Sequence, residues 1–153
     1  MPALRPIVTR DASEEDLPEI IRLERESFPG DPYPYFVLRQ FMDAFGRSMQ
    51  VLDAGTRLCG YVLTTPPHAG RSWVLSLSVT PGMRRQGLGR RLMTGSLTQL
   101  RAAGVHSVRL TVEPANHAAV LLYKSLGFAQ VGDGPRPDYF GPGEDRLLMT
   151  LTL

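Results

Sequence analysis

The stretch LSLSVTPGMRRQGLGRRLM, residues 75–93, joins a strand pattern to a helix pattern and decides the fold. As far as Val79, leucines alternate with serines, which is typical of a strand with one apolar face and one small polar face. The small polar face predicts room for something to lie beside the strand. Pro81 and Gly82 end the strand, and a glycine-rich turn then leads into a helix that runs to about Ala103.

A glycine-rich turn between a strand and a helix is a candidate anion site. The first N–H groups of a helix have no partner inside the helix and point toward the turn, and glycine lets a ligand approach the backbone closely. Two nucleotide motifs are excluded, because no Lys follows Gly89 and because Leu92 stands where the dinucleotide motif has its third glycine. From these residues alone, a phosphate site and a plain turn are about equally well supported. Nucleic-acid binding is supported only by the neighbouring arginines.

The composition indicates an ordinary folded domain. The 153 residues predict a single domain, residues 1–153, and 42% of them are hydrophobic, which suffices for a sizeable core. No run of 18 apolar residues is present, which excludes a transmembrane helix. The first residues lack the apolar core of a signal peptide, and the single cysteine, Cys59, cannot form an internal disulfide. We therefore expect a cytoplasmic protein with no membrane partner.

The charge pattern favours a local anion site. The formal net charge is only +2, and the basic residues gather at RRQGLGRR, residues 84–91. This distribution favours one site for an anionic group over a generally basic surface.

The rest of the chain alternates helix and strand patterns. A helix follows the capping residues Ser13–Asp16 and runs to Phe28, with Glu24 as the polar exception on its apolar face, and Asn116 begins another helix that ends at Gly127. A short helix is expected at about 37–45, and strands are expected at 48–53, 57–64, 73–79, 107–113 and 147–153, with two shorter ones at 7–10 and 129–131. This order predicts an α/β (α+β) fold, in which helices pack on the faces of a mostly antiparallel sheet.

Three spaced motifs resemble the GNAT superfamily of acetyl-coenzyme-A-dependent N-acetyltransferases. RRQGLG, residues 84–89, fits its R/Q-x-x-G-x-G/A motif, and LTVEPANHAAVLLYKSLGF, residues 110–128, is similar to its later pattern. The end GEDRLLM, residues 143–149, is similar to that of the Rim-type ribosomal-protein N-terminal acetyltransferases. The resemblance covers roughly residues 13–153. It implies an acyltransferase with a single mixed sheet of six or seven strands, splayed in the middle, with helices on both faces.

The resemblance also implies the donor site. Acetyl-coenzyme A would be the cofactor, and its pantetheine arm would pair with the backbone of the splayed strand, where an N–H near Val79 would polarise the thioester carbonyl. The pyrophosphate would lie on backbone N–H groups of the turn, with the arginine side chains contributing less. Asn116 would contact the cofactor as well as cap its helix. The residues implied at the cofactor are Leu77, Ser78, Val79, Arg84, Arg85, Gln86, Gly87, Leu88, Gly89, Arg90 and Asn116.

The implied chemistry is direct attack of an amine on the thioester. Tyr123 stands at the position that protonates the departing thiolate, and a phenol has a suitable pKa, although without the motif a core tyrosine would be the simpler interpretation. A Glu of the Rim-type pattern is replaced by Thr111, which cannot take a proton at neutral pH. Glu113, on the same strand face, could act as the base through water. The alternatives for the base are Tyr139, near the amine, and a water chain that ends at backbone carbonyls. Cys59 is expected to be an inert thiol that takes no part in the transfer.

The acceptor is expected to be a primary amine, with a peptide or protein N-terminus favoured over a small molecule. Two segments rich in aromatic residues and proline, 28–36 and 132–143, would frame it, and Tyr33, Tyr35 and Tyr139 are the candidate contacts. A non-catalytic acetyl-coenzyme-A-binding module is an alternative that Thr111 permits. We expect no metal, because the three histidines lack metal-ligand spacing, and no nucleic-acid partner; the sequence leaves monomer and homodimer open.

Overall fold

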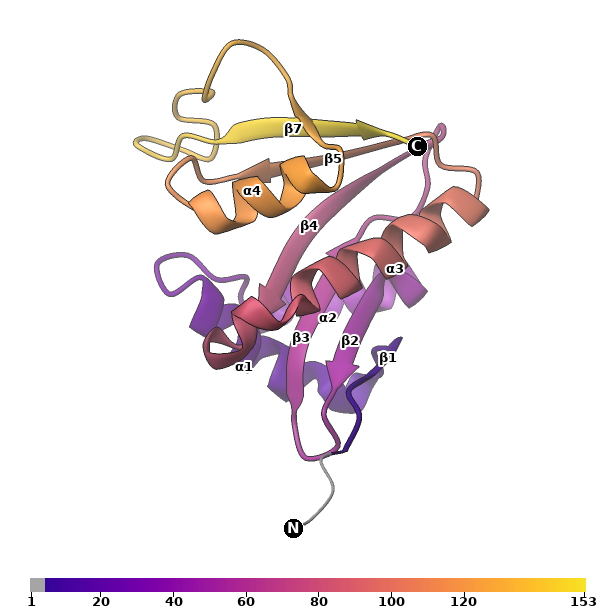
Figure 1. Cartoon of the computed structure of the whole chain (residues 1–153). Helices are drawn as coiled ribbons and strands as arrows, with labels where there is room; N and C mark the ends of the chain where they lie inside the picture. The colour runs from indigo at the N-terminus through magenta and orange to yellow at the C-terminus, as the bar shows by residue number, and fades with distance from the viewer. Residues whose placement is uncertain (1–4) are drawn as a thin grey trace.

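The computed structural model describes residues 5–153, apart from the side chain of Arg85. Its centre is one sheet of seven strands in the order β1-β2-β3-β4-β5-β7-β6 (Figure 1). Neighbouring strands are antiparallel, except that β4 and β5 are parallel. The strands are β1 (Val8–Asp11), β2 (Met49–Asp53), β3 (Leu58–Thr64), β4 (Arg71–Val79), β5 (Ser107–Val112), β6 (Ala129–Gln130) and β7 (Leu147–Thr152). The predicted mixed, mostly antiparallel sheet is therefore confirmed.

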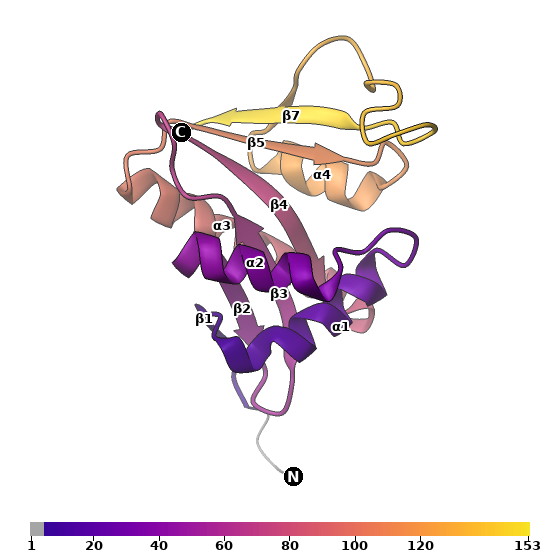
Figure 2. The same ribbon diagram turned by 180° about the vertical axis from the view of Figure 1, so that it is seen from behind.

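Helices cover both faces of this sheet, as predicted. One face carries α1 (Leu17–Ser27) and α2 (Tyr35–Phe45), and the other carries α3 (Leu88–Ala102) and α4 (His117–Ser125) (Figures 1 and 2). Each helix pair covers its own cluster of buried apolar side chains, so the core has two parts with the sheet between them. None of the described helices is long and apolar enough to cross a membrane. Three short 3-10 helices are η1 (Glu14–Asp16), η2 (Gly46–Ser48) and η3 (Pro81–Gln86).

The sheet is splayed between β4 and β5, and a β-bulge marks the point of divergence. The first part of β4, Arg71–Val74, pairs with β5, whereas the remainder of β4 pairs only with β3. The register between β3 and β4 shifts at Leu75, which is the extra residue on β4. A bulge bends its strand and increases the local twist. The bulge thus turns the end of β4 away from β5, which gives the splay that the resemblance implied.

The small polar face of β4 is covered by α1. Ser76 and Ser78 are 6% and 2% exposed, because α1 lies on their face of the strand. The Ser78 hydroxyl donates to the carbonyl of Leu23 at 2.9 Å, and the Ser76 hydroxyl donates to the carboxylate of Glu24 at 2.8 Å. The room predicted beside the small polar face is thus filled by α1, and the backbone groups of β4 without a strand partner are on its edge.

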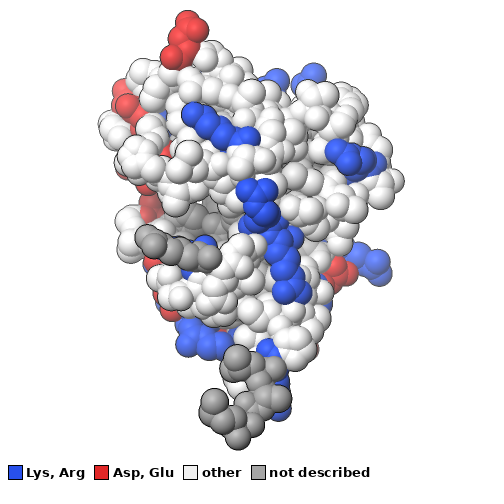
Figure 3. All heavy atoms as spheres, in the orientation of Figure 1, with Lys and Arg blue, Asp and Glu red and all other residues white. Residues whose placement is uncertain are grey.

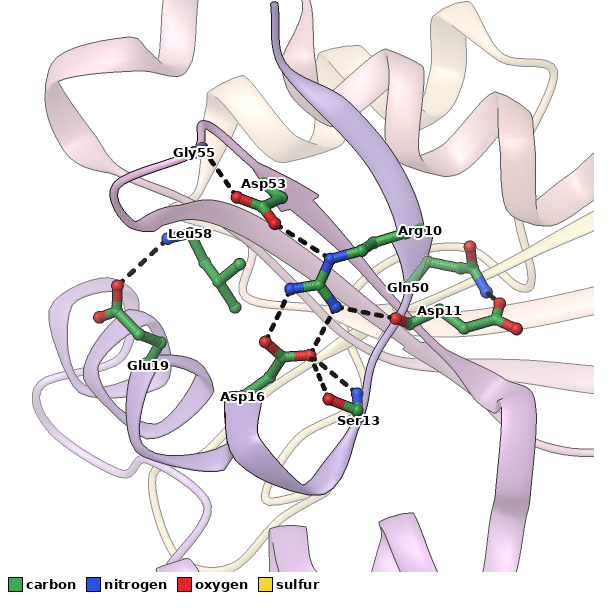
Figure 4. A network of polar contacts seen from close by, with 9 residues as sticks. All are labelled: Arg10, Asp11, Ser13, Asp16, Glu19, Gln50, Asp53, Gly55 and Leu58. Atoms are coloured by element: carbon green, nitrogen blue, oxygen red, sulfur yellow. Dashed lines mark hydrogen bonds and ion pairs between the residues drawn. The ribbon is translucent and has the colours of Figure 1, made fainter. Parts of the chain in front are cut away.

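A cluster of polar side chains, which we call the Arg10 cluster, fixes the N-terminal edge of the sheet (Figure 4). The guanidinium of Arg10 donates to both oxygens of Asp16, at 2.7 and 2.8 Å, and to Asp53 at 3.1 Å. Asp16 also accepts the N–H of Ser13 at 2.8 Å. The hydrogen bonds from Arg10 hold the pKa of Asp16 below its usual value. The Arg10 cluster therefore joins β1, η1 and the end of β2 in one closed set of bonds.

Candidate active site

The two glycines of the turn have different structural causes. Gly87, the residue before α3, has a φ of +73°, in the left-handed region that favours glycine, and open space surrounds its Cα. Gly89 is in the first turn of α3, where a Cβ would come within 3.3 Å of the Leu122 side chain on α4. Gly87 therefore makes the turn, while Gly89 lets α3 approach α4. The residues before them are not irregular, since they form η3.

The arginine side chains of the turn contact neighbouring elements. Arg84 donates to the carbonyl of Val79 at 3.2 Å, Arg91 donates to the carbonyl of Ile7 at 2.6 Å, and Arg90 donates to the hydroxyl of Ser125. Among the described residues no side chain caps the start of α3, so its first N–H groups remain for a ligand. Basic side chains form a band across the face that carries α3 (Figure 3). Arg85 belongs to η3, and its side chain lies outside the described part.

The edge of β4 that faces the splay has no strand partner beyond Val74, although the Val79 carbonyl accepts from Arg84. Leu77, Ser78 and Val79 pair with β3 on one side and have no strand on the other. An extended ligand can add to such an edge as an extra strand does. Just beyond it, the Thr80 hydroxyl is buried without a hydrogen-bond partner among the described residues. The free edge thus continues directly into the uncapped turn, which suits a long ligand with an anionic end.

Tyr123 belongs to the buried face of α4. It is 7% exposed, its ring meets that of Phe128 edge to face at 5.9 Å, and it shares a core cluster with Val79 and Val112 from the two splayed strands. Burial raises the pKa of Tyr123 to about 12, so the phenol is protonated at neutral pH and can act as a proton donor. Asn116 accepts the N–H of Ala119 at 3.2 Å, which begins α4 two turns before Tyr123.

Residues 15–128 match the sequence model of the acetyltransferase (GNAT) family. The chain belongs to this family. It is 31% identical to the [ribosomal protein bS18]-alanine N-acetyltransferase of Escherichia coli over 154 residues, which cover 90% of this chain and 92% of that protein. It is 27% identical to the N-alpha-acetyltransferase of Sulfurisphaera tokodaii over 156 residues, covering 94% and 92%.

The fold is similar to that of solved structures. Ard1 from Thermoplasma volcanium superposes with a TM-score of 0.88 over 96% of this chain and 97% of that one, at 22% identity. The predicted family, the GNAT fold and an acyltransferase enzyme are therefore confirmed.

One of the candidate bases of this acetyltransferase, Glu113, has an unexpected neighbour. Glu113 follows the end of β5, and its carboxylate lies 3.7 Å from Nη2 of Arg146. Arg146 also binds Glu144 at 3.1 Å, and its guanidinium lies 5.0 Å from the ring centre of Phe140. Glu113 thus pairs with the connection between β6 and β7, which weakens the hypothesis that it takes a proton from the acceptor. Thr111 is inside β5, opposite Leu148 of β7.

The three candidate acceptor tyrosines differ in accessibility. Tyr35 and Tyr139 are 51% and 40% exposed, whereas Tyr33 packs edge to face on Phe41 and donates its hydroxyl to the carbonyl of Leu75 at 3.4 Å. Both views show the two segments that carry them extending from the same side of the molecule, near the diverging ends of β4 and β5 (Figures 1 and 2). The fold therefore leaves Tyr35 and Tyr139 accessible and uses Tyr33 in packing.

The structure buries one acid for which the sequence pattern predicts no role. Glu24 interrupts the apolar face of α1 and is 2% exposed. The only sequence signal was this interruption, because the groups that bind Glu24 come from β3, β4 and the segment after α1.

Proposed function

We propose that this chain is an N-acetyltransferase that moves an acetyl group from acetyl-coenzyme A to the α-amine of a peptide or protein by direct attack. The observation that carries the proposal is the continuity between the free edge of β4 and the uncapped start of α3. Both curated relatives are named for transfer to α-amino groups, one to an alanine of a ribosomal protein, and this supports the peptide acceptor.

The donor site would be held mainly by backbone groups. Leu77, Ser78 and Val79 would bind the pantetheine arm along their free edge, and a backbone N–H near Val79 would donate to the thioester oxygen as charge develops there. The backbone N–H groups from Arg84 to Arg90 would bind the pyrophosphate, assisted by the positive end of α3. Asn116 would contact the cofactor from the start of α4. Bound acetyl-coenzyme A supplies the activated acetyl thioester.

Tyr123 would act as the general acid. Its buried hydroxyl would donate a proton to the thiolate sulfur as the carbon–sulfur bond breaks. Burial raises the pKa of Tyr123 to about 12, which keeps the phenol protonated before the reaction, and burial would likewise raise the basicity of a thiolate that forms beside it. The acceptor must lose one proton to attack and another after it. Glu113 through water, Tyr139, and a water chain to backbone carbonyls all remain hypotheses for that step. The ion pair with Arg146 favours the last two.

The acceptor would lie between the two aromatic segments. The exposed Tyr35 and Tyr139 would contact the acceptor directly, and Tyr33 would support the site by packing on Phe41. Flat, rigid side chains of this kind offer contact area at low entropic cost to an extended peptide. A small amine such as an amino acid or polyamine is the competing acceptor class, and only the experiment below separates the two.

Two measurements test this function. Acetyl-coenzyme A at saturation should raise the Tm, because a ligand that binds only the folded state stabilises it. Free thiol should then be released with unblocked peptides, and not with the same peptides acetylated at the N-terminus. The decisive comparison is between a peptide with a free α-amine and an N-terminally acetylated peptide that offers only a lysine amine. Thiol release is expected with the first peptide and not with the second. Release with polyamines but with none of the peptides would contradict the peptide acceptor, and an unchanged Tm would contradict the donor.

A further inference from the structure

Glu24 is a buried carboxylate whose described bonding partners are all neutral. Its Oε1 accepts the hydroxyl of Tyr61 and, at 2.8 Å, that of Ser76, while its Oε2 accepts the backbone N–H of Tyr33 at 2.9 Å. None of the ion pairs in the described part of the chain includes Glu24. Burying a carboxylate without a cation is costly unless donors satisfy it. The residue therefore requires an explanation beyond helix packing.

The three donors come from elements that meet at the splay. Tyr61 is on β3, Ser76 is on the part of β4 that has left β5, and Tyr33 belongs to the acceptor segment, residues 28–36. Tyr33 makes a second link to β4, because its hydroxyl donates to the carbonyl of Leu75, the bulge residue. One carboxylate thus connects the acceptor segment to the free half of the donor strand.

The acceptor segment has few other anchors of its own. Three of its residues are prolines, which have no N–H to donate. Between the two helices, the N–H of Asp31 donates to the carbonyl of Phe28 at 3.3 Å, a bond inside the segment that ties it to nothing else. The Phe28 N–H donates to the backbone carbonyl of Glu24 at 2.9 Å and only continues the hydrogen bonding of α1. Beyond Phe28, the Tyr33 N–H is the described backbone donor of the segment that reaches α1, at the carboxylate of Glu24. Removing the Glu24 carboxylate, which accepts this hydrogen bond, would release the 28–36 segment while leaving the sheet and α1 in place.

We propose that Glu24 is a positioning residue of the acceptor site, which holds the 28–36 segment against the free half of β4 and so sets the affinity for the amine. The inference rests on the proposed N-acetyltransferase function. Tyr35, at the start of α2, follows two residues after the anchored N–H and moves with it. The acetyl donor would bind the backbone edge of Leu77–Val79 and the start of α3. Glu24 meets β4 through the Ser76 side chain and bonds none of those backbone groups, so we expect the donor affinity to change little when the anchor is lost.

Two substitutions separate a hydrogen-bonding role from other roles. In Glu24→Gln the amide oxygen can still accept the Tyr33 N–H, and the amide nitrogen can donate to the two hydroxyls, which can rotate to accept. In Glu24→Leu no acceptor remains. The matched control is Glu26→Leu, which removes a partly exposed glutamate of the same helix whose partner is Arg22.

The measurement is steady-state kinetics with the acceptor and the donor varied in turn. We expect Glu24→Leu to raise the KM for the peptide tenfold or more, roughly the value of one lost hydrogen bond to a charged group. The KM for acetyl-coenzyme A should stay within about twofold, Glu24→Gln should recover most of the peptide affinity, and Glu26→Leu should match the parent. An equal rise in both KM values, or a lower Tm with unchanged kinetics, would overturn the proposal. Equal damage from Gln and Leu would also overturn it, because the charge itself would then be needed.

Hydrogen exchange tests the anchor without activity. In the unaltered protein the Tyr33 amide should exchange more slowly than the other amides of the 28–36 segment, and in Glu24→Gln the protection should persist. Fast exchange at Tyr33 in the parent would refute the anchor even if Glu24→Leu does not fold. If the parent acetylates none of the amines but Tyr33 is protected, the proposed function fails while the anchor stands.

Discussion

Asp16 and Glu24 are buried carboxylates of the same N-terminal helical region, yet they have opposite surroundings. Asp16 is 8% exposed and binds both arms of the Arg10 guanidinium, so its charge is balanced within the cluster. Glu24 is 2% exposed and binds two hydroxyls and one backbone N–H. The Asp16–Arg10 ion pair satisfies its own charges. The Glu24 carboxylate instead accepts hydrogen bonds from three different elements, and it thereby fixes their positions relative to one another.

The same contrast extends to the two regions around these acids. In the region of the Arg10 cluster, the polar groups bind one another and the strands are paired. Around the splay, the edge of β4 and the start of α3 keep free donors. Substitutions in the first region should therefore change stability and leave kinetics alone, whereas substitutions in the second should act mainly on kinetics.

The largest expected effect is on the rate, from Tyr123→Phe. Loss of the proton donor should lower kcat about 100-fold, the lower range for general acid catalysis. The ring and its packing on Phe128 are kept, so the free energy of unfolding should change by less than about 1 kcal/mol. Thiol release and urea denaturation give the two values. An unchanged kcat would remove Tyr123 from the mechanism, and a large loss of stability would make it a core residue alone.

The next effect is on stability, from Arg10→Met. Leaving a buried acid without its cation costs about 3–5 kcal/mol in closed sites, and we expect about 2 kcal/mol here because the Arg10 side chain is 36% exposed. Kinetic constants at neutral pH should not change. Adding Asp16→Asn to Arg10→Met should recover part of the loss, and a double variant no more stable than the single one would contradict the balanced pair.

The same pair predicts an acid dependence. Because the folded-state pKa of Asp16 is lowered, its stabilisation is present above the unfolded pKa of about 3.9 and is lost as the pH falls through the folded value. Urea midpoints measured from pH 6 downward should therefore fall less steeply below about pH 4 in Arg10→Met than in the parent. Parallel curves would show that the pair does not shift the pKa.

The sequence predicted the elements well because its local signals are strong. Leu147 and Met149 alternate as a strand requires, and Asn116 caps α4 where the pattern begins. It failed at partners distant along the chain. Small serines on β4 do not say that α1 covers them, and the spacing of Glu113 does not reveal Arg146, which another part of the chain places beside it. The splay itself came from the family resemblance, since a register shift at Leu75 leaves no pattern in the sequence.

A smaller effect is expected at the turn, from Gly87→Ala. A φ of +73° costs a non-glycine residue about 1 kcal/mol, so the free energy of unfolding should fall by about that amount. The strain can relax by moving the turn, which should raise the KM for acetyl-coenzyme A severalfold. The matched control is Gly82→Ala in the same turn, where a Cβ meets open space. Equal effects of the two variants on KM would mean that the conformation of Gly87 does not shape the donor site.

The smallest effect is expected from Glu113→Gln. This variant decides whether the Glu113–Arg146 ion pair belongs to the splay region, where substitutions change kinetics. If the carboxylate mainly pairs with Arg146, Gln should leave kcat within about threefold, because an ion pair whose Glu113 side chain is 61% exposed contributes little. The pH profile of kcat/KM should keep its acid limb, since the group that loses its proton would be elsewhere. A loss of 100-fold or more, together with a shift of that limb, would instead make Glu113 the base. The ion pair would then belong to the splay region, as a contact that must open before the acceptor can be deprotonated.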